Sequence, residues 1–393
     1  MQLSGMIRSK SSLLFVAAML AACSDASTPT APLSPKALTV SASRVADVRS
    51  SALERAGAVY TLTNAVDGNA VIAFRRSADG TLSRLGSFST GGRGIGGTVD
   101  PLVSQYAVVL SPDHEALFAV DAGSNQLSSF RVKQDGSLSL QSVVSSGGQR
   151  PISIAVHGNV LYTLNGASNR LAGFRIADDA RLVPLTHSAR SLPVGANGAA
   201  AVRFTPDGRF LVVSERVSNR LDVFPVQRNG RLGDAVVSAA PGSASFGFDI
   251  TSNNQPIVSE TQGSVSSYAL APNGAATPIT ASISTGGQAP CWVIITSDGR
   301  FAYSTNAGSG TIAGFAINDG GLTSLTPGAP TADVGAGTSP IDLDQVGGRL
   351  LYTLDAGKGA ISAFAIAGDG RLTRLADAAA GAAASGLQGL AAF

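Results

Sequence analysis

The chain has 393 residues, of which 44% are hydrophobic and 14% are charged, and its formal net charge is +2. This composition excludes an intrinsically disordered chain, which would carry more charge and fewer apolar residues. The near balance of charge argues against a nucleic-acid-binding protein, and the two cysteines are too few for a disulfide-rich scaffold.

The first 22 residues have the features of a bacterial lipoprotein signal peptide. Arg8 and Lys10 form a basic start, and the apolar stretch that follows, about 10 residues long, is too short to span a bilayer. The segment ends in Leu20-Ala-Ala-Cys23, which resembles a lipobox, so we expect Cys23 to be the lipid attachment site. Ser24 rather than Asp follows the cysteine, and by resemblance to known sorting patterns this favours an outer-membrane lipoprotein that faces the periplasm, with surface exposure left open. An ordinary secretory signal with a chance cysteine is the alternative.

Residues 23–55 are predicted to form the lipidated N-terminus and an extended linker. Pro29, Pro32 and Pro35 recur among serine, threonine and alanine, a composition that favours a solvated spacer. A short helix over residues 43–55 is left open. The folded domain is predicted to cover residues 56–393.

Two independent markers each recur seven times in this domain, which indicates a repeat protein. One marker is the turn Asp/Asn-Gly-x-Leu, or a degenerate copy of it, with an aromatic residue four or five positions earlier. Its copies begin at residues 79, 135, 179, 229, 273, 319 and 369. The other is a short β-rich run that ends in a polar residue, namely Asn64, Asp121, Asn165, Glu215, Glu260, Asn306 and Asp355.

Each repeat contains alternating apolar and polar stretches for about four strands, separated by hairpin turns such as Pro206-Asp-Gly208. Four short strands repeated seven times predict an all-β, seven-bladed β-propeller of four-stranded blades. An open solenoid is the alternative. The first repeat begins at its second strand, near Gly57, and the segment Ser385–Phe393 resembles the missing first strand. We therefore expect the C-terminal strand to close the ring and remove the exposed sheet edges.

The repeat consensus combines Gly-Gly-x-x-Pro, Pro-Asp-Gly-Arg-x-Leu-Tyr-x-x-Asn, Ser-Asn-x-Leu-x-x-Phe and Asp-Gly-x-Leu. It resembles the seven-bladed lactonase-type propellers, the family of propeller 6-phosphogluconolactonases and fungal carboxymuconate-lactonising enzymes. It is also similar to Tyr-Val-Thr-Asn repeat proteins. The resemblance covers residues 56–393 and is specific for the fold, whereas a fold hosts many activities.

The resemblance implies that an active member carries a histidine, an arginine, a glutamate and a second arginine at one mouth of the channel. Such a set would move a proton and stabilise an oxyanion. When we count from the Pro-Asp-Gly turn, these four positions hold Tyr106, Ala200, Arg216 and Ala307. None matches. A shift of one residue would put Glu215 in the glutamate position and Arg203 near the first arginine, so Glu215 and Arg216 are the candidate catalytic residues.

The inner-strand position where the resemblance implies a histidine is occupied around the ring by apolar or small residues: Tyr106, Ile152, Ala200, Phe246, Cys291 and Pro340. This predicts a channel mouth that binds little charge or is filled by packing. Trp292, beside this ring, is either a packed core residue or a platform for a ligand. In the polar column that ends the β-rich runs, Asn and Asp are expected to satisfy turn amides. Glu215 and Glu260 are the exceptions, and either one is a candidate general base.

Two further patterns are predicted to carry no cofactor or metal. Gly92–Gly97 matches Gly-x-Gly-x-x-Gly, but no helix pattern follows it, so it is predicted to be an inter-blade loop. The three histidines, His114, His157 and His187, lack the spacing of metal ligands.

These observations predict a lipid-anchored, periplasm-facing platform that acts as a monomer and binds an envelope protein or a small ligand, without lactonase chemistry. The alternative is a lactonase-type hydrolase or isomerase with an altered active site. Binding is expected to use the loops 91–103 and 239–246. The candidate ligand-binding residues are Tyr106, Arg203, Glu260 and Trp292.

Overall fold

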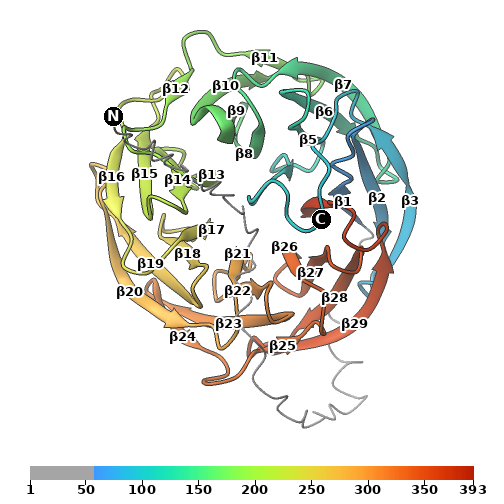
Figure 1. Ribbon diagram of the computed structural model, residues 1–393, viewed down its shortest axis with the longest axis vertical. Helices are drawn as coiled ribbons and strands as arrows, with labels where there is room; N and C mark the ends of the chain where they lie inside the picture. Colours follow the sequence, from blue (N-terminus) through green and yellow to red (C-terminus); the bar gives the residue numbers. More distant parts are fainter. Residues whose placement is uncertain (1–56) are drawn as a thin grey trace, which may run out of the picture.

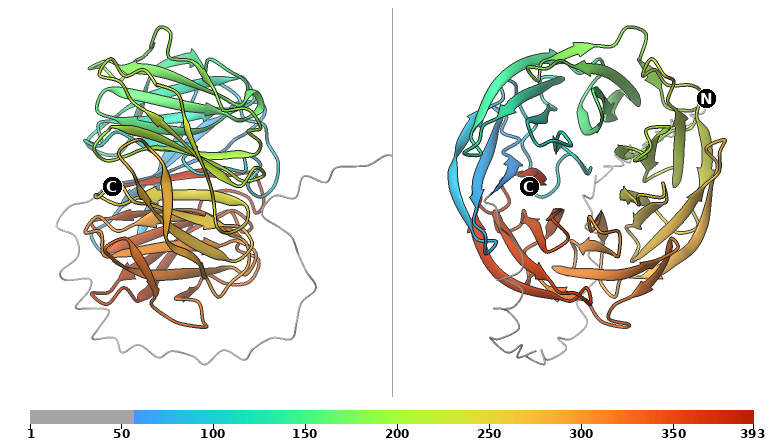
Figure 2. Two further views of the ribbon diagram at one scale, coloured as in Figure 1. Left: turned by 90° about the vertical axis from the view of Figure 1, so that its left-hand side faces the viewer. Right: turned by 180° about the vertical axis from the view of Figure 1, so that it is seen from behind.

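Seven antiparallel β-sheets surround a central channel in the computed structural model, which describes residues 57–393 (Figure 1). Five sheets have four strands, and two have a short fifth strand at one side. Figure 2 shows the same ring from the side and from behind. The prediction of a seven-bladed propeller with four-stranded blades is confirmed.

The first four blades follow one another along the chain. Blade 1 contains β1 (Gly57–Leu62), β2 (Ala70–Arg76), β3 (Leu82–Ser89) and the last strand, β30 (Gln388–Ala392). Blade 2 contains β4 (Val108–Leu110), β5 (Ala116–Asp121), β6 (Gln126–Val132) and β7 (Leu138–Ser145). Blade 3 contains β8 (Pro151–His157), β9 (Val160–Asn165), β10 (Arg170–Ile176), β11 (Leu182–Pro184) and β12 (Arg190–Ser191). Blade 4 contains β13 (Ala199–Phe204), β14 (Phe210–Glu215), β15 (Arg220–Pro225) and β16 (Val236–Ala239).

The remaining three blades complete the ring. Blade 5 contains β17 (Ser245–Ile250), β18 (Pro256–Glu260), β19 (Ser264–Leu270) and β20 (Ala276–Ser284). Blade 6 contains β21 (Pro290–Ile295), β22 (Phe301–Asn306), β23 (Thr311–Asn318), β24 (Gly321–Ser324) and β25 (Ala332–Asp333). Blade 7 contains β26 (Pro340–Val346), β27 (Leu350–Asp355), β28 (Ala360–Ile366) and β29 (Leu372–Ala379). A single turn of 3₁₀ helix, η1 (Gly166–Ser168), is the only helical segment in the part of the chain that the structure describes.

The C-terminal strand closes the ring, as the sequence predicts. β30 pairs antiparallel with β1, and Tyr60 lies opposite Ala391. Arg76 adds a side-chain bond to the chain end, because its Nε donates to the carbonyl oxygen of Phe393 over 2.9 Å. Blade 1 is therefore built from both ends of the domain, with the C-terminal strand β30 as its innermost strand.

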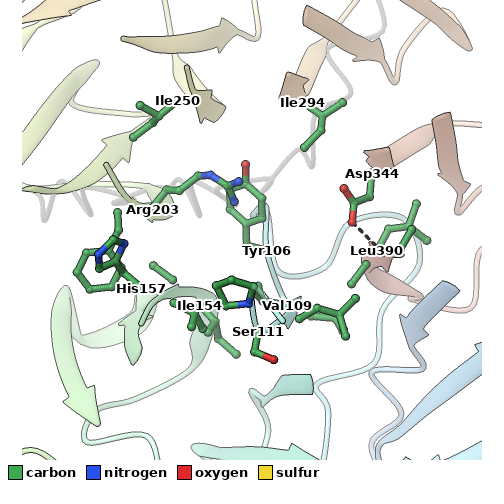
Figure 3. Close-up of a pocket in the computed structure, with 18 of the residues that line it drawn as sticks. Tyr106, Val109, Ser111, Ile154, His157, Arg203, Ile250, Ile294, Asp344 and Leu390 are labelled. Atoms are coloured by element: carbon green, nitrogen blue, oxygen red, sulfur yellow. Dashed lines mark hydrogen bonds between the residues drawn. The ribbon is translucent and has the colours of Figure 1, made fainter. Parts of the chain in front are cut away.

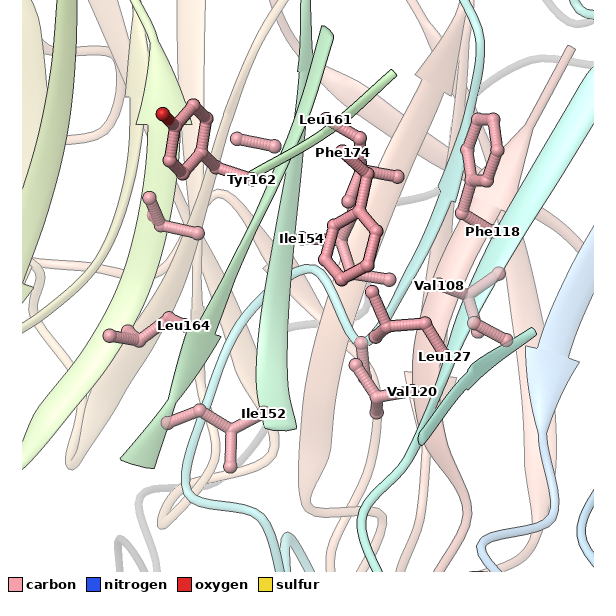
Figure 4. Packing of buried hydrophobic residues seen from close by; sticks show 14 of the residues in the cluster. Val108, Phe118, Val120, Leu127, Ile152, Ile154, Leu161, Tyr162, Leu164 and Phe174 are labelled. Carbon is pink, nitrogen blue, oxygen red and sulfur yellow. The ribbon is translucent and has the colours of Figure 1, made fainter. Parts of the chain in front are cut away.

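Apolar side chains fill the space between neighbouring blades. Figure 4 shows this packing where β4, β5 and β6 of blade 2 face β8, β9 and β10 of blade 3. Strand residues alternate between the two faces of a sheet, and both faces of a blade meet another blade. The strands are consequently apolar on both sides, which accounts for the low charge of the chain.

Buried tyrosines link consecutive blades and explain why both sequence markers recur. The hydroxyl of Tyr60 in blade 1 donates to the carbonyl oxygen of Gly136 in the hairpin turn of blade 2, over 2.9 Å. The same bond joins Tyr162 to Gly230, Tyr303 to Gly370 and Tyr352 to Gly80. These turn glycines have φ between 82° and 86°, a conformation that disfavours other residues.

An irregular segment between β3 and β4 crosses the central channel, and we call residues Asp100–Tyr106 the plug. Figure 1 shows this stretch, before β5, turning into the middle of the ring. The Gln105 side chain donates to Val293 O over 2.7 Å, and Ser104 Oγ donates to Ile152 O over 2.8 Å. The plug thereby bonds to blades 6 and 3, and it separates a cavity at one mouth of the channel from a cavity at the other.

The signal peptide, Cys23 and the linker predicted from the sequence lie outside the described residues. Within residues 57–393, no helix has the length and hydropathy needed to cross a membrane.

Candidate functional site

A cavity of about 370 Å³ opens at the end of the channel where the innermost strands begin. We call it the mouth cavity. Its walls come from the plug, from the loops that precede β8 and β13, and from the loops that follow β9 and β14: Gly97, Thr98, Val99, Asp100, Pro101, Leu102, Val103, Arg150, Ile152, Gly166, Ala167, Gly198, Ala199 and Arg216. Part of the predicted binding loop 91–103 lies here.

Three charged side chains in these walls have polar atoms without partners. Asp100 Oδ2, Arg150 Nε and Arg216 Nε are all buried, and none makes a hydrogen bond. Arg150 is held in place by its Nη2, which donates to the carbonyl oxygen of Pro101 over 2.7 Å. Buried polar groups are almost always hydrogen-bonded, so three unpaired atoms around one cavity indicate a place for a polar ligand.

Asp100 is mostly protonated at neutral pH. Burial raises its pKa to about 8, although neighbouring polar groups, among them Ser104 N, which donates to Oδ1 over 3.4 Å, and the charge of Arg216 lower it. Asp100 also has a positive φ of 46°, a conformation that Asp tolerates better than most residues. In its neutral form the carboxyl can donate a hydrogen bond into the cavity.

Glu215, a candidate catalytic residue, does not line this cavity. It is fully buried, its Oε2 accepts from the backbone nitrogen of Asn197 over 3.1 Å, and it pairs with Arg220 Nε at 3.0 Å. The next residue, Arg216, uses its backbone nitrogen to donate to Gly198 O over 2.8 Å. Glu215 thus fixes the loop that presents the Arg216 side chain. Burial and the neighbouring carboxylate of Glu215 raise the pKa of Asp222 above its usual value.

Glu260 and Trp292 are likewise part of the framework. Glu260 is fully buried and accepts from the backbone nitrogen of Gly242 and from the hydroxyl of Ser266. Trp292 is fully buried, and its indole nitrogen donates to the carbonyl oxygen of Ser104 over 2.9 Å. Its ring meets Phe246 edge to face, with 5.3 Å between centroids. Neither residue belongs to the walls of either channel cavity.

The other two candidates, Tyr106 and Arg203, meet on the opposite side of the plug (Figure 3). They line a second cavity, also of about 370 Å³, which we call the far cavity. The Arg203 guanidinium lies over the Tyr106 ring, 4.6 Å from its centroid, and Arg203 Nε pairs with Asp249 Oδ1 at 2.7 Å. The sequence candidates therefore divide between two cavities and the core.

Seven residues at one repeat position, which sequence reasoning missed, surround the far cavity: six line it, and the seventh, Asp249, pairs with Arg203 in its wall. Each lies opposite the first residue of a β-rich run, so the column was readable from the repeats: Val109, Ala155, Arg203, Asp249, Ile294, Asp344 and Ala391. Three of the seven positions carry a charged residue. The column that the sequence analysis aligned with the lactonase positions lies nearer the start of each inner strand.

That earlier column needs one correction, because Pro340 is not its member in blade 7. Pro340 pairs with Asp355 as Pro290 pairs with Asn306, so the residue equivalent to Cys291 is Ile341. The β26–β27 hairpin has Gly347-Gly348 in place of a Pro-Asp-Gly turn, which shifted the count by one. The column remains apolar after this change.

The four positions implied by the lactonase resemblance also separate in space. Tyr106 faces the far cavity, and Arg216 faces the mouth cavity. Ala200 and Ala307 are buried in the core. Among residues 57–393, no three histidine, cysteine, aspartate or glutamate side chains are grouped to hold a metal ion.

Sequence comparison finds a match to the family model described as lactonase, seven-bladed β-propeller, over residues 58–195 and 184–262. The 6-phosphogluconolactonase of Yersinia pseudotuberculosis is 24% identical over 174 residues, which is 42% of this chain and 52% of the relative. That of Serratia proteamaculans is 24% identical over 174 residues, 42% of this chain and 53% of the relative. The chain thus spans about half the length of these curated relatives.

Two solved structures share the fold at low sequence identity. The periplasmic gluconolactonase of Pseudomonas aeruginosa superposes with a TM-score of 0.65 at 19% identity, covering 85% of this chain and 99% of that protein. A protein from Lactobacillus plantarum gives a TM-score of 0.69 at 16% identity, covering 86% of this chain and 99% of that protein. At these identities the similarity shows the fold alone.

Proposed function

The chain belongs to the lactonase family of seven-bladed β-propellers, and from this premise we propose that it binds a small carboxylate-bearing ligand in the mouth cavity without cleaving a lactone. The observation that carries the proposal is the set of unpaired buried atoms on Asp100, Arg150 and Arg216 around that cavity. Two guanidinium groups attract an anion, and charge-assisted hydrogen bonds to a carboxylate are about twice as strong as neutral ones.

The names of the relatives suggest a sugar acid as the ligand class. Lactone-cleaving enzymes of the gluconolactone type release a polyhydroxy carboxylate, and the cavity offers groups for both of its parts. Arg150 and Arg216 would hold the carboxylate, and the neutral carboxyl of Asp100 would hydrogen-bond to a hydroxyl.

The proposal expects no lactone cleavage at neutral pH because the mouth cavity has no histidine and no carboxyl that is mainly ionised there. Base catalysis of lactone opening needs a group that is deprotonated at the working pH. Asp100 is the only carboxyl in the walls of the mouth cavity, and burial raises its pKa to about 8, so it is mostly protonated at pH 7. No histidine lines the cavity.

We further propose that the protein works at the cell envelope, as a monomer attached to the outer membrane through Cys23 and facing the periplasm. The signal-like N-terminus and the fold shared with a periplasmic gluconolactonase support this placement. An envelope protein could meet the same loop-rich face that contains the mouth cavity.

Calorimetric titration of the purified chain with D-gluconate tests the binding proposal, and D-glucono-δ-lactone tests the absence of turnover. We expect gluconate binding that weakens at least tenfold in Arg216→Ala and in Arg150→Ala. Arg300→Ala is the matched control, because Arg300 pairs with Asp298 on an exposed hairpin away from the cavity walls. Lactone hydrolysis above the spontaneous rate that scales with pure protein would contradict the proposal and favour the altered lactonase.

A further inference from the structure

The far cavity is a second site with a different chemistry from the mouth cavity. The innermost strands of all seven blades contribute to its walls, and Tyr106 of the plug lies between it and the mouth. Figure 3 shows Arg203 and Asp344 on opposite sides of Tyr106, with Ile250 and Ile294 along the rim between them and Leu390 beside Asp344. The cavity thus combines two charged groups with an aliphatic surface.

The positive charge of Arg203 is already compensated. Its Nε pairs with Asp249 Oδ1 at 2.7 Å, and its guanidinium lies over the Tyr106 ring. The other oxygen of Asp249 accepts from the backbone nitrogen of Ile295 over 3.0 Å, so Asp249 is fixed in place. An incoming anion would have to compete with this carboxylate for the guanidinium.

Asp344 lacks such a counter-charge. Its two oxygens accept one backbone N–H each, from Ala392 and from Gln345, both over 2.8 Å. No ion pair of Asp344 occurs among residues 57–393. Each carboxylate oxygen can accept a further hydrogen bond. When ionised, Asp344 is a carboxylate in the wall of this cavity that no ion pair holds, although the charge of Arg203 acts on it from a distance.

We propose that the far cavity binds a small organic cation, whose ammonium group pairs with Asp344 and whose aliphatic part packs against Ile294 and Leu390. A primary ammonium supplies three donors, and the cavity wall supplies two oxygens with free lone pairs. The aliphatic surface favours an alkylammonium over an inorganic ion, which would leave that surface in contact with water. This site is independent of the proposed carboxylate site, because the plug lies between them.

Binding to Asp344 is coupled to its ionisation. Burial raises the pKa of Asp344 to about 7, with the charge of Arg203 lowering it and that of Asp249 raising it. The cation should therefore bind more tightly above pH 7 and release a proton on binding below it. The titratable or charged groups that face Asp344 across the cavity and from its own strand are Tyr106, His114, His157, Arg203, Asp249 and Asp342.

Ligand-detected NMR with three four-carbon probes, n-butylammonium, n-butyrate and n-butanol, tests the proposal on the full chain. At pH 8 we expect n-butylammonium to bind at least tenfold more tightly than either other probe. Asp344→Asn should weaken that binding at least tenfold, whereas Asp298→Asn, on an exposed hairpin, should not change it. Lowering the pH to 6 should weaken binding to the unmodified protein as well.

Three outcomes would overturn the proposal. They are butyrate binding as tight as butylammonium binding, butylammonium binding that is unchanged by Asp344→Asn and by pH, and no butylammonium binding at millimolar concentration. If Asp344→Asn does not fold, the pH comparison on the unmodified protein decides alone. Arg216→Ala should leave butylammonium binding unchanged, so failure at one cavity is distinguishable from failure at the other.

Discussion

The indole nitrogen of Trp292 in blade 6 donates a 2.9 Å hydrogen bond to the carbonyl oxygen of Ser104 in the plug. The two residues are 188 positions apart in sequence, and the bond is fully buried. It fixes the plug across the channel, and the Gln105 side chain adds a second bond to the neighbouring Val293. The separation of the mouth cavity from the far cavity depends on this attachment.

Replacing Trp292 with phenylalanine should loosen the plug. The change removes the donor to Ser104 O and leaves that carbonyl buried without a partner, which costs about 1–3 kcal/mol. The smaller ring also leaves a void against Phe246. We expect a lower free energy of unfolding in denaturant titration and faster hydrogen exchange at Gln105 N, which donates to Ala200 O. Unchanged stability and unchanged exchange would show that the plug is held by other contacts.

Replacing Asp100 with asparagine should stabilise the protein in a pH-dependent way. The folded pKa of Asp100 is about 8, above the usual value, so the folded state keeps a proton that the unfolded chain releases near pH 4. Stability from this group is therefore present at acid pH and is lost as the pH rises toward 8. Asparagine does not ionise, so the gain over the unmodified protein should grow from about pH 4 to about pH 8.

The magnitude follows from the size of the pKa difference, on the order of 1.4 kcal/mol for each pH unit. Thermal melts of both proteins across this pH range provide the measurement. A difference in melting temperature that is flat with pH, or that shrinks as the pH rises, would show that Asp100 is ionised in the folded protein.

The tyrosine bonds between blades predict a contrast between two buried hydroxyl groups. Tyr352→Phe removes the donor to Gly80 O, a contact between blade 7 and blade 1 at the ring closure, and should cost about 1–2 kcal/mol. Tyr268→Phe is the matched control, because the buried hydroxyl of Tyr268 has no hydrogen-bond partner. That variant should be as stable as the unmodified protein or more so. Equal losses in urea titration for the two variants would contradict this explanation of the repeats.

The fold could be predicted from the sequence because its markers have physical causes that recur in every blade. The turn glycine adopts positive φ, the tyrosine donates to it from the preceding blade, and Ser385–Phe393 has the pattern of an inner strand. These are local constraints, and a sequence read without any structure still displays them.

The plug could not be predicted in the same way, because residues 100–105 lie outside the repeat. Asp100, Val103 and Tyr106 all have positive φ without being glycine, and their partners come from distant blades. Arg216 was identified, but Asp100 and Arg150 were not. Arg203 was identified, but through an alignment with a different column of the inner strand. Asp344 was missed, although it lies opposite Tyr352, the first residue of a β-rich run, and could have been found by counting from that run.

A crystal structure of the chain soaked with D-gluconate tests the central claim most directly. We predict density in the mouth cavity, with the carboxylate between the guanidinium groups of Arg150 and Arg216 and a hydroxyl within hydrogen-bond distance of Asp100. An empty mouth cavity at saturating gluconate, or gluconate bound only beyond the plug beside Arg203, would contradict the proposed site.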